Sequence, residues 1–457
     1  MTVTGERTEA LTATRIAEGV RSGALDPEAV VADSLARIGR HDEVLSAFAS
    51  VRTEAALGEA RELARRVAAG GEHLPLAGVP VAVKDVVPVA GEVMRAGSRA
   101  TDRAPQPSDH PVVARLRDAG AVVVGTTTMP EAALWLTTDG DRITRNPWQP
   151  ERSASGSSGG SAAALGAGLV PLAHGTDGLG SIRQPAAACG VLGLKPSRGL
   201  IPAELGGNDW YGLAENGPMA TTVADLALML SVMADDVELA QVRPLRRSLR
   251  VAVSAKPPVQ GVRTNPAITA ALFAAAALLR RNGHHVERDQ PVYPQRLSMA
   301  GTLRWFAVAA DYADGVADQS LLQNRTVGHA SAGRRLRPLV RSEQLTEWRD
   351  RVDAFFDSYD LMLTPVTATH PLRAERWSER AWAANVRSNI AASGGFSGMW
   401  NVAGFPALTF PFGIDTVTGT PIGLQLAARH GQEALLLSAA ARIEAWRPWA
   451  RTAPGWV

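Results

Sequence analysis

The stretch from Arg152 to Gly190 reads RSASGSSGGSAAALGAGLVPLAHGTDGLGSIRQPAAACG and is dominated by glycine, serine and alanine. Within it, residues 157–161 (SSGGS) place hydroxyl groups on a backbone with few Cβ atoms. Such a loop bends sharply, brings amide N–H groups close to a ligand and holds hydroxyls against one another. A second small-residue turn, residues 178–181 (GLGS), presents a serine positioned to attack a carbonyl carbon. The N–H groups just before that serine face the oxygen that becomes negative.

Two other interpretations of a Gly/Ser-rich segment are a flexible connection and a phosphate cradle, and on composition alone both are commoner than a hydrolytic centre. The phosphate interpretation is weakened because neither G-x-x-x-x-G-K-[ST] nor G-x-G-x-x-G occurs in this segment. The flexible interpretation is weakened because the loops alternate with apolar, helix-forming residues such as those of 161–167.

The residues before this segment predict a mixed α/β fold. Apolar positions at helical spacing over residues 8–70 predict two or three amphipathic helices, which form a helical N-terminal layer. Leu76–Val87 (LAGVPVAVKDVV) predicts a buried strand with Lys84 near its end. A helix over Pro111–Asp118 and a strand over Ala121–Gly125 follow. This β-α-β alternation predicts a large, mostly parallel twisted sheet covered by helices on both faces.

The residues after the segment continue the alternation of helices and strands. Helices are predicted over Thr222–Met233, Asn265–Asn282, 295–357 and Glu433–Trp446. Strands are predicted over Leu249–Ser254, His285–Arg288, Leu361–Thr364, Ala407–Phe412 and Ile422–Ala427. With no internal repeat and no low-complexity linker, we expect one domain over 1–457. Its parts are the N-terminal layer to about 70, a core over about 71–235 and a variable helical region over about 290–390.

Composition excludes several classes of function. The 47 basic and 45 acidic residues are spread without long like-charge blocks, which gives no electrostatic reason to expect nucleic acid or an anionic membrane as partner. The single cysteine, Cys189, excludes an intrachain disulfide and a thiolate metal cluster and fits a reducing compartment. Residues 1–25 lack the apolar core of a signal peptide. We therefore expect a cytoplasmic protein without cofactor, metal or membrane partner; a homodimer is compatible with the composition.

A set of ordered motifs resembles the amidase-signature family. The motifs are VAVKD around Lys84, NPW at 146–148, the segment 152–190, GLKPSRG at 193–199, GPMATTVADLALML at 217–230, GFPALTFPFG at 404–413 and TPIGLQLAARHGQEALLL at 420–437. The resemblance covers nearly the whole chain apart from roughly 290–390. It implies a hydrolase of small amides with Ser181 as nucleophile, Ser157 as a bridging serine after a cis peptide bond, and Lys84 as the catalytic lysine.

The resemblance also implies roles for the loop around the nucleophile. The backbone N–H groups of Gly178, Leu179 and Gly180, with that of the serine itself, would form the oxyanion hole. Asp177 and Arg183 match positions that buttress the loop. The chain departs from the family at Leu179, where a glycine is usual, and at residues 154–155, where Ala-Ser stands for Pro-Gly. Because Leu179 carries a Cβ atom, we expect a negative φ there and a narrower pocket.

A lysine acts as a base near neutral pH only if its pKa falls about 3 units below its ordinary value of about 10.4. Burial at the end of the apolar VAVK strand would supply that desolvation. Considered without the two serines, a lysine is more often paired with an acid or extended to solvent than used as a base. The adjacent acid here is Asp85. Neighbouring residues on a strand point to opposite faces, which disfavours that pairing. We interpret His174 as a core or supporting residue and Cys189 as a small buried apolar residue.

The substrate is the least determined part of the prediction. Candidate pocket residues are aromatic or apolar and favour a hydrophobic or aryl acyl group: Met129, Trp135, Trp210, Tyr211, Phe396, Met399 and Trp400. The first function we consider is hydrolysis of a small carboxamide to a carboxylic acid and ammonia or an amine. The alternatives are the glutaminase subunit of a tRNA-dependent amidotransferase, and an acyl-transferring or non-catalytic biosynthetic relative.

Overall fold

A single 11-stranded sheet runs through the protein in a computed structural model, which describes residues 11–70, 73–206 and 208–456. The strand order is β1-β3-β2-β4-β6-β5-β10-β11-β9-β7-β8. The strands are β1 (Phe48–Val51), β2 (Pro80–Lys84), β3 (Val122–Thr127), β4 (Leu172–Asp177), β5 (Leu192–Lys195), β6 (Glu215–Ala220), β7 (Arg250–Val253), β8 (His285–Arg288), β9 (Leu361–Pro365), β10 (Ala407–Ile414) and β11 (Pro421–Ala428).

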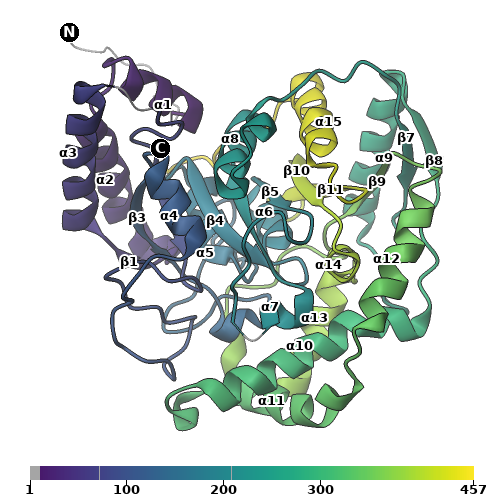
Figure 1. Ribbon diagram of the computed structural model, residues 1–457. Helices are drawn as coiled ribbons and strands as arrows, with labels where there is room; N and C mark the ends of the chain where they lie inside the picture. The colour runs from purple at the N-terminus through teal and green to yellow at the C-terminus, as the bar shows by residue number, and fades with distance from the viewer. Residues whose placement is uncertain (1–10, 71–72, 207, 457) are drawn as a thin grey trace.

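Helices cover the sheet, and the N-terminal helices pack beside β2 and β3 at one end of it (Figure 1). The α-helices are α1 (Ala13–Arg21), α2 (Pro27–Leu45), α3 (Thr53–Ala69), α4 (Pro111–Asp118), α5 (Gly159–Gly166), α6 (Arg183–Cys189), α7 (Asn208–Gly212), α8 (Val223–Ala234), α9 (Pro266–Arg281), α10 (Gln295–Gly315), α11 (Asn324–Leu336), α12 (Glu343–Phe355), α13 (Trp382–Ser393), α14 (Gly398–Ala403) and α15 (Glu433–Trp446). Short 3-10 turns are η1 (Glu131–Ala133), η2 (Val237–Ala240), η3 (Gln319–Leu321), η4 (Arg337–Leu339) and η5 (Trp377–Glu379).

The predicted α/β class is confirmed, but the prediction of a mostly parallel sheet is wrong. Six of the ten strand pairings within the described residues are antiparallel. Parallel pairs occur where a helix connects the strands, as between β2 and β3. The centre of the sheet, from β4 through β6, β5, β10, β11 and β9, is antiparallel throughout.

The error arises from strands that the sequence pattern did not reveal. Strands β4, β5 and β6 (LAHGTD, LGLK and ENGPMA) are buried at every position, so they show no alternation of polar and apolar residues. They are also rich in glycine and polar residues, which are unusual in strands. Likewise β1 lies within residues 8–70, where only helices were expected. Glycine permits close packing here: a Cβ atom at Gly217 of β6 would lie 2.2 Å from the Leu194 carbonyl oxygen.

Two of the predicted helices, α8 and α9, begin directly after a residue that caps them. The Thr222 hydroxyl accepts a hydrogen bond from the Asp225 N–H at the start of α8, and the Asn265 side chain accepts from the Ala267 N–H at the start of α9. Such caps satisfy amides that have no partner within the helix. The first residue of α9, Pro266, needs no such partner. The helix over 433–446 matches its predicted bounds.

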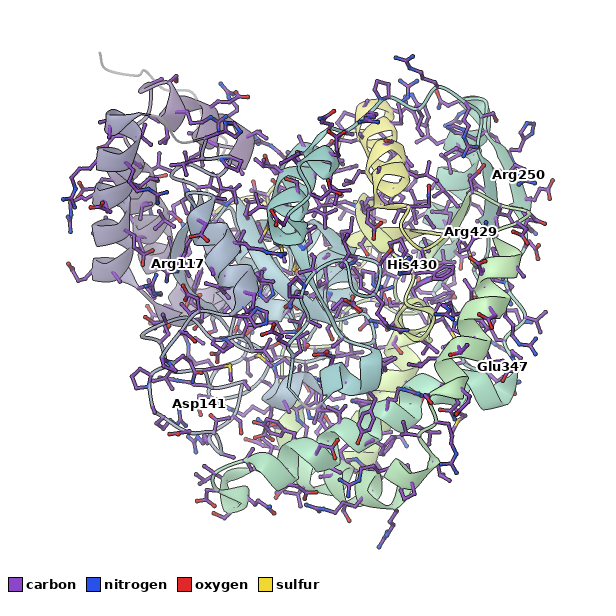
Figure 2. The ribbon with its side chains drawn as sticks, in the orientation of Figure 1. Arg117, Asp141, Arg250, Glu347, Arg429 and His430 are labelled. Carbon is purple, nitrogen blue, oxygen red and sulfur yellow. The ribbon has the colours of Figure 1, made fainter. Side chains whose placement is uncertain are left out.

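The rim of the molecule carries exposed polar side chains of both signs, such as Asp141 and Arg250 (Figure 2). None of the helices in residues 11–70, 73–206 and 208–456 is long and apolar enough to cross a bilayer. The predictions for residues 1–10, including part of the expected helical layer, lie outside the described residues. One continuous sheet contains all the strands from β1 to β11. The expected single domain over 1–457 and its division into parts stay predictions.

Candidate active site

Lys84 is the last residue of β2, and its side chain is completely buried. Its Nζ atom lies 2.7 Å from Ser157 Oγ and 2.8 Å from Thr176 Oγ1, with the Thr176 carbonyl oxygen at 3.4 Å. Burial lowers the pKa of Lys84 to about 7, although the charge of Asp177 acts in the opposite direction. Asp85 follows the end of the strand, and its carboxylate accepts the Arg95 N–H rather than pairing with Lys84.

The three oxygen partners of Lys84 satisfy the amine in either protonation state. A neutral amine has two hydrogens and one lone pair, so it can donate to Thr176 twice and accept the Ser157 hydroxyl hydrogen. A protonated amine can donate to all three oxygens. The same three contacts can therefore hold the amine in one place in both protonation states.

Ser157 is buried between Lys84 and the start of α5. The peptide bond between Gly156 and Ser157 is cis, as expected from the resemblance. At Gly156 a Cβ atom would lie 2.5 Å from the Trp135 carbonyl oxygen, so only glycine fits there. The preceding residue, Ser155, has a φ of 67°, a left-handed conformation that costs a residue with a Cβ atom roughly 1 kcal/mol. Serine at position 155, where the resemblance implies glycine, therefore introduces local backbone strain.

Ser181 lies on the loop between β4 and α6 and is half-buried. Its carbonyl oxygen accepts a hydrogen bond of 3.1 Å from the N–H of Ser158, which ties the loop that carries Ser181 to the loop that carries Ser157. Ser181 also borders a cavity of about 120 Å³. Hence Lys84 and Ser157 lie in the interior, and Ser181 lies where a ligand in the cavity can reach it.

The amides of this loop fall into two groups. The N–H of Gly180 donates to Asp177 Oδ1 at 2.6 Å, and the N–H groups of Ile182 and Arg183 donate to Oδ2 at 3.2 and 3.4 Å. Among the described residues, no acceptor is found for the N–H groups of Leu179 and Ser181. The Gly180 hydrogen is held by a carboxylate in this conformation, and its expected role as an oxyanion donor stays a prediction.

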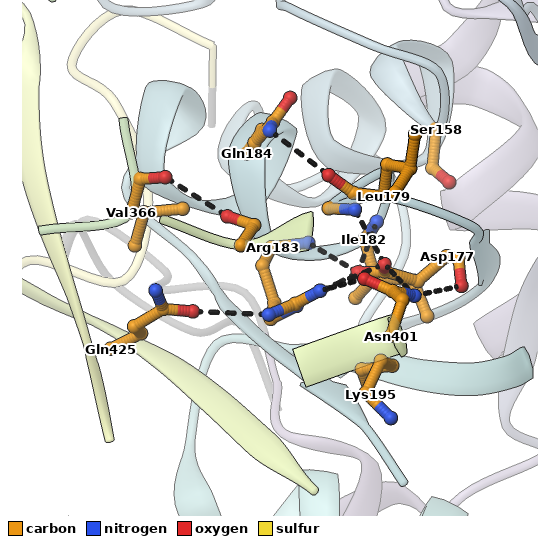
Figure 3. Close-up of polar contacts among 12 residues, drawn as sticks. Ser158, Asp177, Leu179, Ile182, Arg183, Gln184, Lys195, Val366, Asn401 and Gln425 are labelled. Atoms are coloured by element: carbon orange, nitrogen blue, oxygen red, sulfur yellow. Dashed lines mark hydrogen bonds and ion pairs between the residues drawn. The ribbon is translucent and has the colours of Figure 1, made fainter. Parts of the chain in front are cut away.

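The carboxylate of Asp177 is held in a buried network (Figure 3). Arg183 donates to both of its oxygens, at 2.9 and 3.0 Å, and both side chains are fully buried. Burial alone would raise the pKa of Asp177, but the Arg183 guanidinium and the Asn401 amide keep it well below its usual range. Arg183 continues to Gln425 Oε1 at 3.1 Å, which joins the loop to β11. The network fixes the loop from behind.

The cavity beside Ser181 is mostly apolar and is enclosed by residues from several distant segments. Its lining is Ala133, Leu134, Trp135, Leu136, Gly156, Leu179, Ser181, Gln184, Trp210, Val259, Gly301, Thr302, Trp305, Asn389, Ile390, Ser393, Gly395, Gly398 and Met399. The predicted pocket residues Trp135, Trp210 and Met399 are therefore among the lining residues. The sequence analysis missed Trp305 and Asn389, which come from α10 and α13, where the family resemblance is weak.

Four of the predicted pocket residues do not line this cavity. Phe396 is buried, and Trp400 is buried in the hydrophobic cluster around α14. Met129 borders a different cavity, of about 550 Å³. Tyr211 donates a hydrogen bond to Asp311. The expected pocket role of these four residues stays a prediction that this cavity does not support, because aromatic and apolar character alone does not distinguish a pocket wall from the core.

Trp210 is presented to the cavity by an unusual turn. Residues Asp209, Trp210 and Tyr211 all have left-handed backbone conformations, with φ of 49°, 56° and 55°. Its indole ring lies against Gly178, where a Cβ atom would come within 2.7 Å of Cε3. A glycine at 178 is therefore needed for the ring to cover the loop that carries Ser181.

Two other titratable groups near the site, those of His174 and Cys189, are buried. His174 is fully buried, its Nε2 lies 2.8 Å from Asn216 Oδ1, and burial lowers its pKa to about 3. Burial raises the pKa of Cys189 above its ordinary range. Thr176, which contacts Lys84 directly, was not found from the sequence, because the strand that carries it was not recognised. In the described part of the chain, no three His, Cys, Asp or Glu side chains are grouped to hold a metal ion.

Comparison with known proteins gives long, nearly complete matches. The AmiB2 chain of Mycobacterium tuberculosis is 39% identical over 94% of this chain and 95% of its own length. The acylamidase of Rhodococcus erythropolis is 33% identical over 97% of both chains. A structure of 6-aminohexanoate cyclic dimer hydrolase complexed with substrate superposes with a TM-score of 0.85, at 28% identity over 98% of this chain and 99% of the other.

Fold, site and relatives together define a class: the protein is an amide hydrolase acting on non-peptide C–N bonds. The family model described as Amidase matches residues 29–437. The chain belongs to this amidase-signature family, as its motifs indicated.

Proposed function

We propose that the protein hydrolyses a small, neutral carboxamide through an acyl-enzyme at Ser181, with Ser157 and Lys84 as the proton relay. The observation that carries the proposal is the 2.7 Å contact between Lys84 Nζ and Ser157 Oγ. This contact is completely buried, and burial lowers the pKa of the amine to about 7. A neutral amine at working pH is a base that can draw a proton from a serine.

Acylation follows from this arrangement. Ser181 Oγ attacks the amide carbonyl carbon while its proton passes to Ser157 Oγ, and the Ser157 proton passes to Lys84 Nζ. The carbonyl oxygen becomes negative and is met by the free N–H groups of Leu179 and Ser181. The C–N bond then breaks, and the proton returns from Lys84 through Ser157 to the departing nitrogen. The products of this half-reaction are the Ser181 ester and ammonia or an amine.

Deacylation uses the same groups in the reverse direction. Water attacks the ester carbonyl and gives a proton through Ser157 to Lys84. Collapse of the second tetrahedral intermediate releases the carboxylic acid, and the relay restores the proton to Ser181 Oγ. Asp177 and Arg183 act as positioning residues, because the carboxylate holds the loop by three amides without touching the cavity.

The cavity supports a neutral and largely apolar substrate. None of its lining residues among those described is charged, and their polar side-chain groups are hydroxyls, amides and indole N–H groups. Glutamine carries a carboxylate and an ammonium group, which need charged or strongly polar partners when they are buried. The lining therefore favours free-standing amide hydrolysis over the glutaminase alternative. Homodimerisation and a cytoplasmic location stay predictions.

The pH dependence of hydrolysis tests this proposal. Protonation of Lys84 removes the base, so we expect kcat/KM to fall about tenfold per pH unit below about 7 and to level off above it. The groups facing the amine are Asp177, which is ionised, and His174, which stays neutral because its pKa is about 3. Neither titrates in this window. The measurement is kcat/KM for a neutral aryl amide between pH 5 and 9.

Asp85 provides the matched control for this profile. Burial also raises the pKa of Asp85 to about 7, although its carboxylate accepts the Arg95 N–H and has no part in the relay. In an Asp85→Asn variant, kcat/KM should still fall below about pH 7 as it does in the wild type. A profile that becomes flat in this variant, or a wild-type profile that falls as pH rises through 7, would assign the titration elsewhere and refute the proposed base.

A further inference from the structure

Leu179 stands two residues before the proposed nucleophile, at a position where the family resemblance implies glycine. It is half-buried, borders the same 120 Å³ cavity as Ser181 and packs against the two hydrophobic clusters that meet there. It is absent from the positive-φ residues of the described chain, so its conformation needs no glycine. What this residue adds to the site is therefore its isobutyl group.

Two glycines make room for that group. A Cβ atom at Gly301, in α10, would lie 2.9 Å from Leu179 Cδ2, and one at Gly398, the first residue of α14, would lie 3.2 Å from the same atom. Both glycines border the cavity. The three atoms nearest to such a Cβ at Gly398 all belong to Leu179, and the Cβ at Gly301 would have one other neighbour, Val402 at 3.4 Å.

Backbone conformation does not explain these glycines. Neither has a φ in the left-handed region, and Gly301 lies inside a helix, where glycine is less favourable than alanine. The requirement is thus space for the leucine. The side chain at 179 and the missing side chains at 301 and 398 form one complementary set.

We propose that Leu179 sets the upper size of the acyl group that the enzyme accepts, with Gly301 and Gly398 holding its isobutyl group in place. The inference rests on the proposed function, because the acyl group is the part of the substrate that stays bonded to Ser181 beside this cavity. Removing the isobutyl group opens the wall next to the acylated oxygen. Adding a methyl group at 301 pushes Leu179 Cδ2 toward the cavity instead.

The test compares acyl groups of different length on one leaving group. For the p-nitroanilides of acetic and hexanoic acid, the ratio of kcat/KM (hexanoyl over acetyl) should rise about tenfold or more in Leu179→Gly, since a few methylenes in an apolar pocket give this discrimination. Leu179→Ala should give a smaller rise and serves if the glycine variant folds poorly. In Gly301→Ala the ratio should fall. In the double variant Leu179→Gly with Gly301→Ala, the alanine should not lower the ratio, because the leucine side chain that it would displace is absent.

Val402→Ala is the matched control, because Val402 is buried against Gly301 but does not border the cavity. It should lower the unfolding temperature and leave the hexanoyl-to-acetyl ratio unchanged. An unchanged ratio in Leu179→Gly, or an equal effect of Gly301→Ala in both backgrounds, would overturn the inference.

A second readout separates failure of this inference from failure of the proposed function. Alkyl fluorophosphonates with methyl and hexyl chains should label Ser181, and the hexyl-to-methyl ratio of labelling rates should follow the same pattern as the anilides. Labelling with an unchanged ratio in Leu179→Gly overturns the role of Leu179 alone. Absence of labelling at Ser181 in the wild type overturns both.

Discussion

Replacing Ser181 with alanine should reduce kcat/KM for amide hydrolysis by about 10⁴-fold or more, because loss of the nucleophile removes the acyl-enzyme route. The side chain is half-buried at the cavity, and the hydrogen bond that joins its loop to Ser158 uses the backbone carbonyl. The variant should therefore fold like the wild type. The measurement combines kcat/KM with mass spectrometry of the 181 peptide after exposure to a fluorophosphonate.

Ser397→Ala is a close control for this variant. Ser397 is buried against the nucleophile loop, near Gly180, and its hydroxyl donates to the Val366 carbonyl oxygen rather than to the relay. It should keep both labelling and hydrolysis. If Ser181→Ala is labelled as well as the wild type, the nucleophile lies elsewhere and the proposed acyl-enzyme is wrong.

Replacing Lys84 with methionine should lower kcat/KM by about 10³-fold or more, since it removes the base from the relay. Methionine keeps most of the length of the lysine side chain and is apolar, which suits a fully buried position. The residual activity should no longer fall below pH 7. Lys84→Arg should be equally impaired, because a guanidinium stays protonated and cannot accept a proton.

Lys195→Met gives a matched control for burial. Lys195 is also fully buried at the end of a strand, and burial lowers its pKa to about 8, against the opposing charge of Glu215. Its Nζ atom donates to the Pro196 carbonyl oxygen and has no part in the relay. This variant should lose stability in thermal unfolding while keeping most of its activity. If Lys195→Met lost as much activity as Lys84→Met, removal of any buried lysine would have this effect. That result would contradict a specific role of Lys84 as the base.

The parts of the fold that follow simple periodicity could be predicted from the sequence. The helix over Pro111–Asp118 and the strand over His285–Arg288 have the expected bounds, because caps and apolar spacing are local signals. Strand direction is not local. It depends on which neighbours a strand finds in the sheet, and the buried strands β4, β5 and β6 carry no alternation that would reveal them.

The candidate site divides in the same way. Motifs placed Lys84, Ser157 and Ser181 in the sequence, and the structure brings the first two into contact. Thr176 was missed because its side chain reaches Lys84 only through the pairing of unrecognised β4 with β2. The pocket wall could not be assigned, because Trp305 and Asn389 reach it from helices with no motif of their own. Residues that reach the site only through the tertiary fold, and that belong to no local motif, cannot be identified from a single sequence.

Direct titration of the Lys84 amine tests the central claim most directly. Lysine labelled with ¹³C at Cε would report the protonation of each amine by NMR, and Lys84→Met would assign the signal. With the amine buried against Ser157 and Thr176, we expect a midpoint near pH 7. A midpoint near the ordinary lysine value of about 10.4 would show that the amine is charged at neutral pH and would contradict the relay.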